Sequence, residues 1–162
     1  MHIKLTAMAL MLLSGLAFAQ EKKVTISAGS KPVFKLSVPK DAEVKIKGEK
    51  TTIQAKHLWI YLWRVQDAET VAAVIPNLGE VIKSEFTNFV VSDTKSIEVL
   101  GHEAKHLMGK GEEADDGDPG TADVVVFTDG KNVFAACVHG EKDEAAKERP
   151  DLLRILKSAE LP

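Results

Sequence analysis

The sequence predicts an α+β fold in which helices pack on a single curved antiparallel β-sheet. Segments with strand-like alternation come first, and a helical segment follows them. A run of hairpin strands comes next, and a second helical segment ends the chain. Because short turns join most of these strands, antiparallel pairing is favoured over repeated βαβ units.

The first 19 residues have the pattern of a secretory signal peptide. Lys4 supplies a positive charge, an uncharged stretch runs from Leu5 to Phe18, and Ala17-Phe18-Ala19 offers a small-x-small cleavage site. The stretch is shorter than the ~20 apolar residues of a membrane anchor. We therefore expect export to the periplasm or the extracellular space, no membrane span after cleavage, and a single domain over residues 20–162.

The composition narrows the classes of partner. The chain has 21 Lys and Arg against 24 Asp and Glu, a net charge of -3, and the two signs are interspersed. A basic stripe that would neutralise phosphates is missing, so nucleic acid is not an expected partner. The single cysteine, Cys137, excludes an internal disulfide. Its apolar neighbours predict a buried thiol.

The first part of the mature chain is predicted to form strands. Val33–Pro39 alternates apolar and polar residues, which is typical of a half-buried strand that Pro39 ends. A short strand around Val44 and Ile46 follows, with a turn at Gly48-Glu49. From Ile53 to Val65 both faces carry apolar residues, so we expect one central strand covered on both sides.

One face of that predicted strand carries an aromatic ladder of Trp59, Tyr61 and Trp63. Such a ladder either stacks a ligand, for example a carbohydrate, or packs in the core under a helix. We favour the core, because each aromatic ring buries roughly 150–250 Å². His57 on the same face is then expected to be a partly buried, hydrogen-bonded imidazole.

The rest of the chain alternates helical and hairpin patterns. We expect a helix that starts after an N-cap at Asp67, is interrupted at Pro76 and continues to Phe86. A hairpin over Ile97–Met108 with its turn at Gly101-His102 should follow, and then an acidic loop over Glu112–Thr121. The last expected elements are a hairpin over Asp123–Val138 with its turn at Asp129-Gly130 and a helix that begins at Pro150.

Four segments resemble motifs of the PsbP/DcrB-like superfamily. They are Phe34–Pro39, Ile97–Ala104, Phe127–Phe134 and Ile155–Ser158, and they occur in the order of the superfamily. The resemblance implies a PsbP-like α+β sandwich. The superfamily includes photosystem accessory subunits, a nuclear-transport Ran-binding protein and bacterial envelope proteins, and it shares no catalytic residues. The resemblance therefore carries a fold but not a function.

The stretch from Leu100 to Glu112 contains His-Glu-Ala-Lys-His, the H-E-x-x-H pattern of zinc peptidases. In a helix, His102 and His106 would share one face and bind a zinc ion, with Glu103 as general base. Gly109 and Glu112 stand where the longer metzincin pattern has its glycine turn and its third ligand.

The surrounding residues favour a strand for this motif. Ser96–Leu100 alternates with a period of two, and Gly101 would cost a helix ~1 kcal/mol relative to alanine. No methionine follows Met108 to form a methionine turn. On a strand, His102 and His106 lie about 13 Å apart at ~3.3 Å per residue, too far to share one ion. We therefore favour a hairpin without a metal and without catalytic residues.

A weaker metal hypothesis joins three histidines with the acidic loop. Histidines and carboxylates together can bind zinc or copper, and the candidates are His57, His106 and His139 with Asp115, Asp116 and Asp118. The three aspartates, with carbonyl oxygens, could instead bind calcium. We favour the alternative of surface histidines and a solvated loop.

The leading functional hypothesis is a non-catalytic binding or accessory domain of the cell envelope, without a cofactor, whose partner is an envelope protein or a small ligand. The alternatives are a small zinc metallopeptidase using His102, Glu103, His106 and Glu112, or a metal-binding envelope protein without catalysis.

Overall fold

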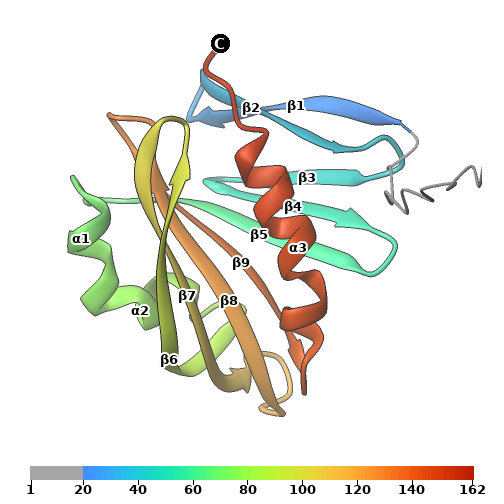
Figure 1. Ribbon diagram of the computed structural model, residues 1–162, viewed down its shortest axis with the longest axis vertical. Coiled ribbons are helices and arrows are strands. Elements are labelled where there is room, and N and C mark those ends of the chain that lie inside the picture. Colours follow the sequence, from blue (N-terminus) through green and yellow to red (C-terminus); the bar gives the residue numbers. More distant parts are fainter. Residues whose placement is uncertain (1–19) are drawn as a thin grey trace, which may run out of the picture.

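A computed structural model describes residues 20–162, and helices pack against both faces of its large sheet (Figure 1). The predicted signal peptide, residues 1–19, lies outside the described residues. The strands are β1 (Glu21–Ala28), β2 (Lys31–Pro39), β3 (Glu43–Lys47), β4 (Lys50–Ala55), β5 (Leu58–Val65), β6 (Phe86–Val99), β7 (His102–Glu113), β8 (Pro119–Thr128) and β9 (Val133–Glu141). The helices are α1 (Val71–Val74), the 3-10 helix η1 (Ile75–Asn77), α2 (Leu78–Ile82) and α3 (Glu144–Lys157).

The strands form one large and one small sheet. Seven strands pair in the order β3-β4-β5-β9-β8-β7-β6, and every pairing is antiparallel. β1 and β2 form a separate two-stranded sheet, whose first strand the sequence patterns did not predict. The predicted α+β fold with a large antiparallel sheet is therefore confirmed. No helix within residues 20–162 is long and apolar enough to cross a membrane.

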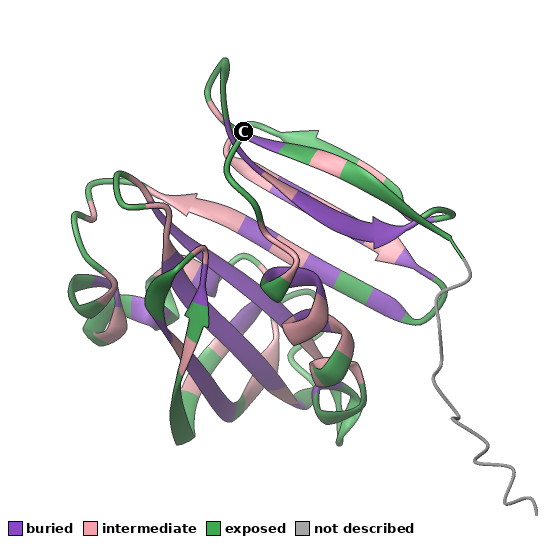
Figure 2. Ribbon diagram, turned by 45° about the horizontal axis from the view of Figure 1, so that its top comes forward, coloured by how far each residue is buried: buried purple, intermediate pink, exposed green. Residues whose placement is uncertain are grey.

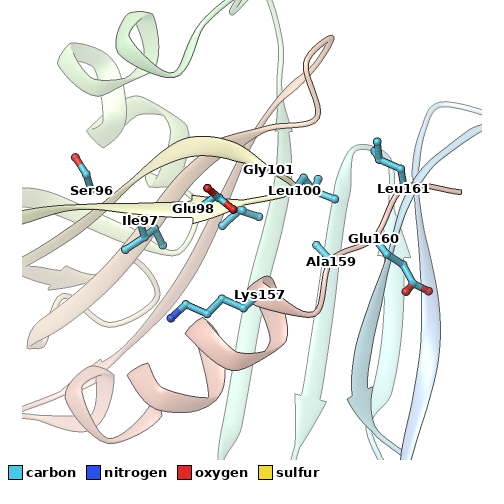
Figure 3. A pocket seen from close by; sticks show the side chains of 10 residues that line it. Ser96, Ile97, Glu98, Leu100, Gly101, Lys157, Ala159, Glu160 and Leu161 are labelled. Carbon is cyan, nitrogen blue, oxygen red and sulfur yellow. The ribbon is translucent and has the colours of Figure 1, made fainter.

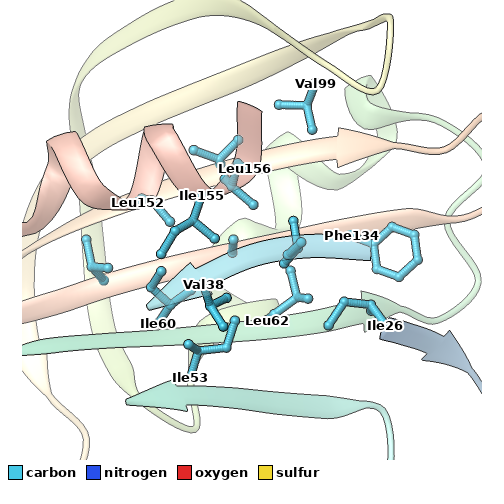
Figure 4. Close-up of a cluster of buried hydrophobic side chains, with 14 of the residues drawn as sticks. Ile26, Val38, Ile53, Ile60, Leu62, Val99, Phe134, Leu152, Ile155 and Leu156 are labelled. Atoms are coloured by element: carbon cyan, nitrogen blue, oxygen red, sulfur yellow. The ribbon is translucent and has the colours of Figure 1, made fainter. Parts of the chain in front are cut away.

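One face of the large sheet is covered over its central strands. The helix α3 and the small sheet β1–β2 pack on it, and Figure 4 shows Leu152, Ile155 and Leu156 of α3 close to Ile60 and Val38. These residues are almost completely buried. Spacing of three and four along α3 places Leu152, Ile155 and Leu156 on one side, which is why this segment is stable as a helix against the sheet.

The opposite face is covered only in part. α1, η1 and α2 are short, and their residues Val74, Leu78 and Ile82 pack against the strands near Leu107 and Val124. β8 and β9 lie in the middle of the sheet and are buried on both faces over most of their length (Figure 2). Apolar residues on both sides of a strand are expected when both sheet faces are covered.

The predicted single strand from Ile53 to Val65 is wrong. The chain reverses at Lys56 and His57, and β4 and β5 pair antiparallel with Ala55 opposite Leu58. Two-residue turns normally reveal themselves by Asn-Gly or Asp-Gly. Here Lys56 takes the left-handed conformation, with φ of 49°, so the usual sequence signal is absent.

The helix boundaries also differ from the predicted ones. Thr70, not Asp67, caps α1: its hydroxyl accepts a hydrogen bond of 3.2 Å from the backbone N–H of Ala73. The helix α2 ends at Ile82, before the predicted end at Phe86, and Phe86 is already the first residue of β6. Phe86 belongs to the buried cluster under these helices, and its apolar side chain therefore fitted a helical pattern equally well.

The helix α3 begins at Glu144, earlier than predicted, and Pro150 lies inside it. A proline removes one helical hydrogen bond. Buried residues on both sides of it, Ala145 before and Leu152 after, hold the helix against the sheet. Packing here outweighs the local preference of proline for a first turn.

The acidic loop is shorter than predicted, because β7 extends to Glu113 and β8 begins at Pro119. Cys137 is fully buried, as predicted, and burial raises the pKa of its thiol well above its usual value. A buried thiol of this kind behaves as a small apolar side chain.

Replacing Gly109 tests the close packing of β7 against Phe89 and Val90 of β6. A Cβ at residue 109 would contact the carbonyl oxygen of Val90 and would lie 2.6 Å from Cε2 of Phe89. Gly109→Ala is expected to lower the free energy of unfolding by about 2 kcal/mol, as overpacking does. Gly79→Ala is the matched control, because a Cβ at this helical position meets nothing within 4 Å. Urea unfolding of both variants measures the difference, and equal stabilities would contradict the packing described here.

Candidate functional site

A cavity of about 680 Å³ lies at one end of the large sheet, where β5 begins and β9 ends. The β7–β8 turn and the first turns of α3 complete its wall. The lining residues are Lys56, His57, Trp59, Tyr61, Glu113, Asp115, Asp116, His139, Gly140, Glu141, Glu144, Lys147 and Glu148. Segments distant in the sequence therefore meet at this end of the fold.

The wall of this end cavity is strongly acidic. Six carboxylates line it against two lysines. One of these lysines, Lys147, lies 3.2 Å from the carboxylate of Asp143, outside the lining. The excess of negative charge favours a positively charged occupant, because a cleft lined mainly by one sign of charge attracts ligands of the opposite sign.

The aromatic ladder contributes two rings to the end cavity. Trp59 is 42% exposed, and Tyr61 and Trp63 are half-buried, so the prediction that the ladder lies in the core is wrong for Trp59 and holds in part for Trp63. The reason is the length of the helices on this face. Trp63 packs against the cluster beneath α1 and α2, whereas α2 ends at Ile82 and leaves the other end of the face uncovered.

A chain of alternating charges lies beside the ladder. Lys50 and Glu85 form an ion pair, and the ammonium of Lys50 lies 4.8 Å from the ring centroid of Tyr61. His139 follows: its Nε2 lies 3.9 Å from Glu85, and its Nδ1 lies 2.5 Å from the Oε2 atom of Glu113. We call Lys50, Glu85, His139 and Glu113 the charge chain.

The imidazole of His139 lies between the ring of Tyr61 and the carboxylates of Glu85 and Glu113. Its imidazole stacks on Tyr61, with the centroids 5.1 Å apart and the planes at 19°. Burial lowers the pKa of His139, but Glu85 and Glu113 raise it by more, and the net shift is upward. The carboxylates thus stabilise the imidazolium form.

Two further groups of the end cavity have shifted pKa values. Burial raises the pKa of Glu148 to about 7, and the backbone N–H of Trp59 offsets only part of this effect. Burial and the nearby negative charge of Glu85 raise the pKa of Tyr61 to about 12. Shifted carboxyl groups in a cavity are typical of binding and catalytic sites.

The H-E-x-x-H motif lies on β7, a strand, as predicted. His102 and Glu103 are exposed, whereas His106 is buried. Their contacts also differ: Glu103 pairs with Lys105, and Glu112 accepts a hydrogen bond of 2.8 Å from Asn88. The structure therefore does not bring the four residues of the peptidase alternative together.

His106 instead belongs to a buried cluster with Asp123 and Arg149, on the face covered by α3. The Nε2 atom of His106 lies 2.7 Å from Oδ2 of Asp123, and Arg149 donates to both oxygens of the same carboxylate, at 2.5 and 3.1 Å. Burial alone would raise the pKa of Asp123, but the hydrogen bonds from His106 and Arg149 outweigh it and hold this pKa below its usual value. This triad joins β7, β8 and α3.

The structure brings together only some of the residues of the weaker metal hypothesis. His57, His139, Asp115 and Asp116 all line the end cavity, whereas His106 lies on the other face and Asp118 is not part of the lining. His57 is exposed at the β4–β5 turn and not partly buried as expected. In the part of the chain that the structure describes, no three His, Cys, Asp or Glu side chains are placed to hold one metal ion.

A second hollow, of about 760 Å³, lies between the β6–β7 turn and the C-terminal segment. Figure 3 shows that its labelled side chains come from Ser96–Gly101 on one side and from Lys157 and Ala159–Leu161 on the other. Its charged residues are few, Glu98, Lys157 and Glu160, and it has no aromatic wall. The end cavity is therefore the better candidate site.

The residues of the end cavity could not be grouped from the sequence. Tyr61, Glu113, His139 and Glu148 come from four different elements, and none forms a spaced motif with another. The signals that were available were the exposed position of the acidic turn and the aromatic alternation along β5. Neither signal alone indicates which charged residues meet.

Replacing Asp123 tests the buried triad. Asp123→Asn keeps the shape but leaves Arg149 and His106 without a charged partner, and it is expected to lower the free energy of unfolding by about 3 kcal/mol at pH 7. Because the pKa of Asp123 is lowered in the folded state, this contribution is present above about pH 4 and is lost as the pH falls. Urea unfolding at pH 7 and pH 3 should show the difference narrowing. Asp118→Asn in the exposed turn is the control, and an equal loss in both variants would contradict the triad.

Glu148 gives the opposite pH dependence. Its pKa is raised on folding, so the folded state is weakened as the pH rises from about 4.5 through about 7. Glu148→Gln is expected to raise the free energy of unfolding at pH 8 by roughly 1 kcal/mol, a value reduced for solvent screening of this partly exposed group, and to change little at pH 5. Thermal unfolding at both pH values measures this, with Glu141→Gln at the exposed rim as control. A gain at pH 5 equal to that at pH 8 would contradict the buried carboxylate.

No family model matches this sequence, and no curated protein matches it. Solved structures do match. One is a crystal structure from Bacteroides thetaiotaomicron VPI-5482, with a TM-score of 0.56 and 16% identity over 88% of this chain. The chain spans about half of that protein, 49% of its length.

Two other matches are similar in length to this chain. The solution structure of cyanobacterial PsbP (CyanoP) from Synechocystis sp. PCC 6803 has a TM-score of 0.55 and 10% identity over 94% of this chain and 99% of that one. A Pseudomonas aeruginosa protein of unknown function, PA94, described as a putative regulator, has a TM-score of 0.50 and 12% identity over 86% of this chain and 96% of that one. At these identities the likeness shows the fold, and the chain has the PsbP-like α+β fold that its motifs predicted.

Proposed function

We propose that this chain is an exported, non-catalytic binding domain of the cell envelope, and that its end cavity binds a positively charged group, an amine or a guanidinium. The observation that carries the proposal is the exposed ring of Trp59 beside six carboxylates in one cavity. Aromatic faces and carboxylates together are the usual partners of organic cations.

The ladder already binds a cation within the protein. The ammonium of Lys50 lies over Tyr61 and 5.6 Å from the ring centroid of Trp63. Tyr61 is further occupied by His139, which stacks on it. Trp59 is the next ring along β5 and has exposed surface facing solvent, so a cation of the ligand would extend the same series of contacts.

The carboxylates of the end cavity supply the second part of the recognition. Burial raises the pKa of Glu113 and that of Glu148, because His139 and the backbone N–H of Trp59 offset only part of the cost of burying these carboxylates. One oxygen of each is buried without a hydrogen-bond partner among the described residues. A bound ammonium or guanidinium would donate hydrogen bonds to such oxygens and offset their desolvation.

The arrangement of the other ionisable groups favours binding over catalysis. His139 lies between two carboxylates, and His106 is buried against Asp123, so each imidazole is already engaged within the protein. The peptidase alternative needs His102 and His106 on one helical face, whereas both lie on a strand. Export and an envelope location rest on the signal-peptide pattern of the first 19 residues.

Titration calorimetry with small probes tests the proposal. Nα-acetyl-arginine amide and tetramethylammonium are expected to bind, and acetate is expected not to bind. Trp59→Ala should weaken binding of the cations about tenfold, the loss of one cation–π contact of roughly 1–2 kcal/mol. Glu98→Gln in the second hollow is the control and should leave binding unchanged.

The same titration has a defined pH dependence. The cavity gains negative charge as Glu148 ionises, so cation binding is expected to tighten between pH 6 and pH 8, and Glu148→Gln should remove most of this change. The charged groups facing Glu148 are Glu144, Asp151 and His139. Cation binding that is absent at every pH, or is unchanged in Trp59→Ala, would overturn the proposed site. Turnover of a peptide or ester substrate would overturn the non-catalytic role.

A further inference from the structure

The two edges of the large sheet differ in length. At one edge β3 has five residues, two of which are lysines. At the other edge β6 has 14 residues and pairs with β7 on one side only. A long edge strand presents a row of unpaired backbone N–H and C=O groups and is a template for another strand.

The second half of β6 is regular and open to solvent. Two irregularities, between Thr87 and Val90 and between Val91 and Asp93, interrupt the pairing with β7 in the first half. From Asp93 to Val99 the pairing is continuous. Residues 91–96 are exposed, and they form the outer edge of the large sheet beside β7 (Figure 1).

Symmetry restricts how this edge can pair with a second copy of itself. Two identical strands that extend a sheet in antiparallel fashion are related by a two-fold axis perpendicular to the sheet, and the contact is the same patch on both copies. Opposite residues must point to the same face. The axis must therefore pass through a pair of identical residues, and each choice of that residue fixes every other pair.

The charges of β6 select one of these registers. With Thr94 on the axis, Asp93 of each copy lies opposite Lys95 of the other copy. With Asp93 or Lys95 on the axis, like charges lie directly opposite each other. Opposite charges across strands are stabilising and like charges destabilising, by roughly 0.2–1 kcal/mol per pair. Asp93 and Lys95 of one chain already lie 3.9 Å apart on one face, so the dimer would carry four alternating charges across the seam.

We infer that this chain forms a symmetric dimer by antiparallel pairing of β6 with β6 of a second copy, centred on Thr94. The contact goes beyond the proposed ligand site, whose lining contains no residue of β6. It joins two seven-stranded sheets into one continuous sheet. The same contact covers the exposed strand edge.

Charge exchange tests the register. Sedimentation equilibrium of the purified protein should show a dimer. Asp93→Lys should weaken dimerisation at least about tenfold, because both cross-strand pairs become repulsive. Combining Asp93→Lys with Lys95→Asp should restore it to within about threefold of the natural chain, because each pair is again of opposite sign. Glu69→Lys, at an exposed residue outside β6, is the control for a change of net charge alone.

Cysteine cross-linking tests the axis independently. In this register the two copies of Thr94 are directly opposite, at ~5 Å between Cβ atoms, so Thr94→Cys should form an intermolecular disulfide under mild oxidation. The copies of Ser96 are about four residues apart along the seam, about 13 Å, so Ser96→Cys should not. Cys137 is fully buried and does not interfere. A monomer at all concentrations, or equal cross-linking at both positions, would overturn the inference. Asp93 and Lys95 would then serve to prevent the exposed edge of β6 from pairing with other strands.

Discussion

The charge chain of Lys50, Glu85, His139 and Glu113 stabilises the part of the sheet that the helices do not reach. α2 ends at Ile82, and beyond it the sheet face has no helical cover. A face of this kind normally needs apolar cover, yet here aromatic rings and a mostly buried series of alternating charges occupy it. Each charge in the chain lies beside its opposite, which offsets the cost of removing these groups from water. The uncovered rings and carboxylates that remain form the end cavity.

The two faces of the large sheet use histidine differently. His106 lies under α3, where Asp123 and Arg149 satisfy it and fasten the helix to the sheet. His139 lies on the opposite face, where Tyr61 and two carboxylates surround it. The first arrangement stabilises the fold. The second keeps negative charge and an aromatic surface available to a ligand, so the two imidazoles have separate roles.

Much of the fold could be predicted from the sequence, because periodicity reports which faces are buried. The alternation of Phe34, Leu36 and Val38 correctly marks β2, and the hairpins that turn at Gly101 and Gly130 were also predicted. The reversal at Lys56 could not be predicted, because its turn carries neither glycine nor asparagine. The candidate site was less predictable than the fold. Its carboxylates and His139 meet only after strands far apart in the sequence pair, and the exposure of Trp59 depends on where a helix on the same face ends.

The protonation of His139 tests the central claim most directly, since the charge chain requires an imidazolium between its two carboxylates. An NMR titration of the imidazole resonances, assigned with His139→Gln, measures its pKa. We expect a pKa above the usual 6.5. A pKa below 6.5 would mean that burial outweighs Glu85 and Glu113, and the charge chain would then not exist.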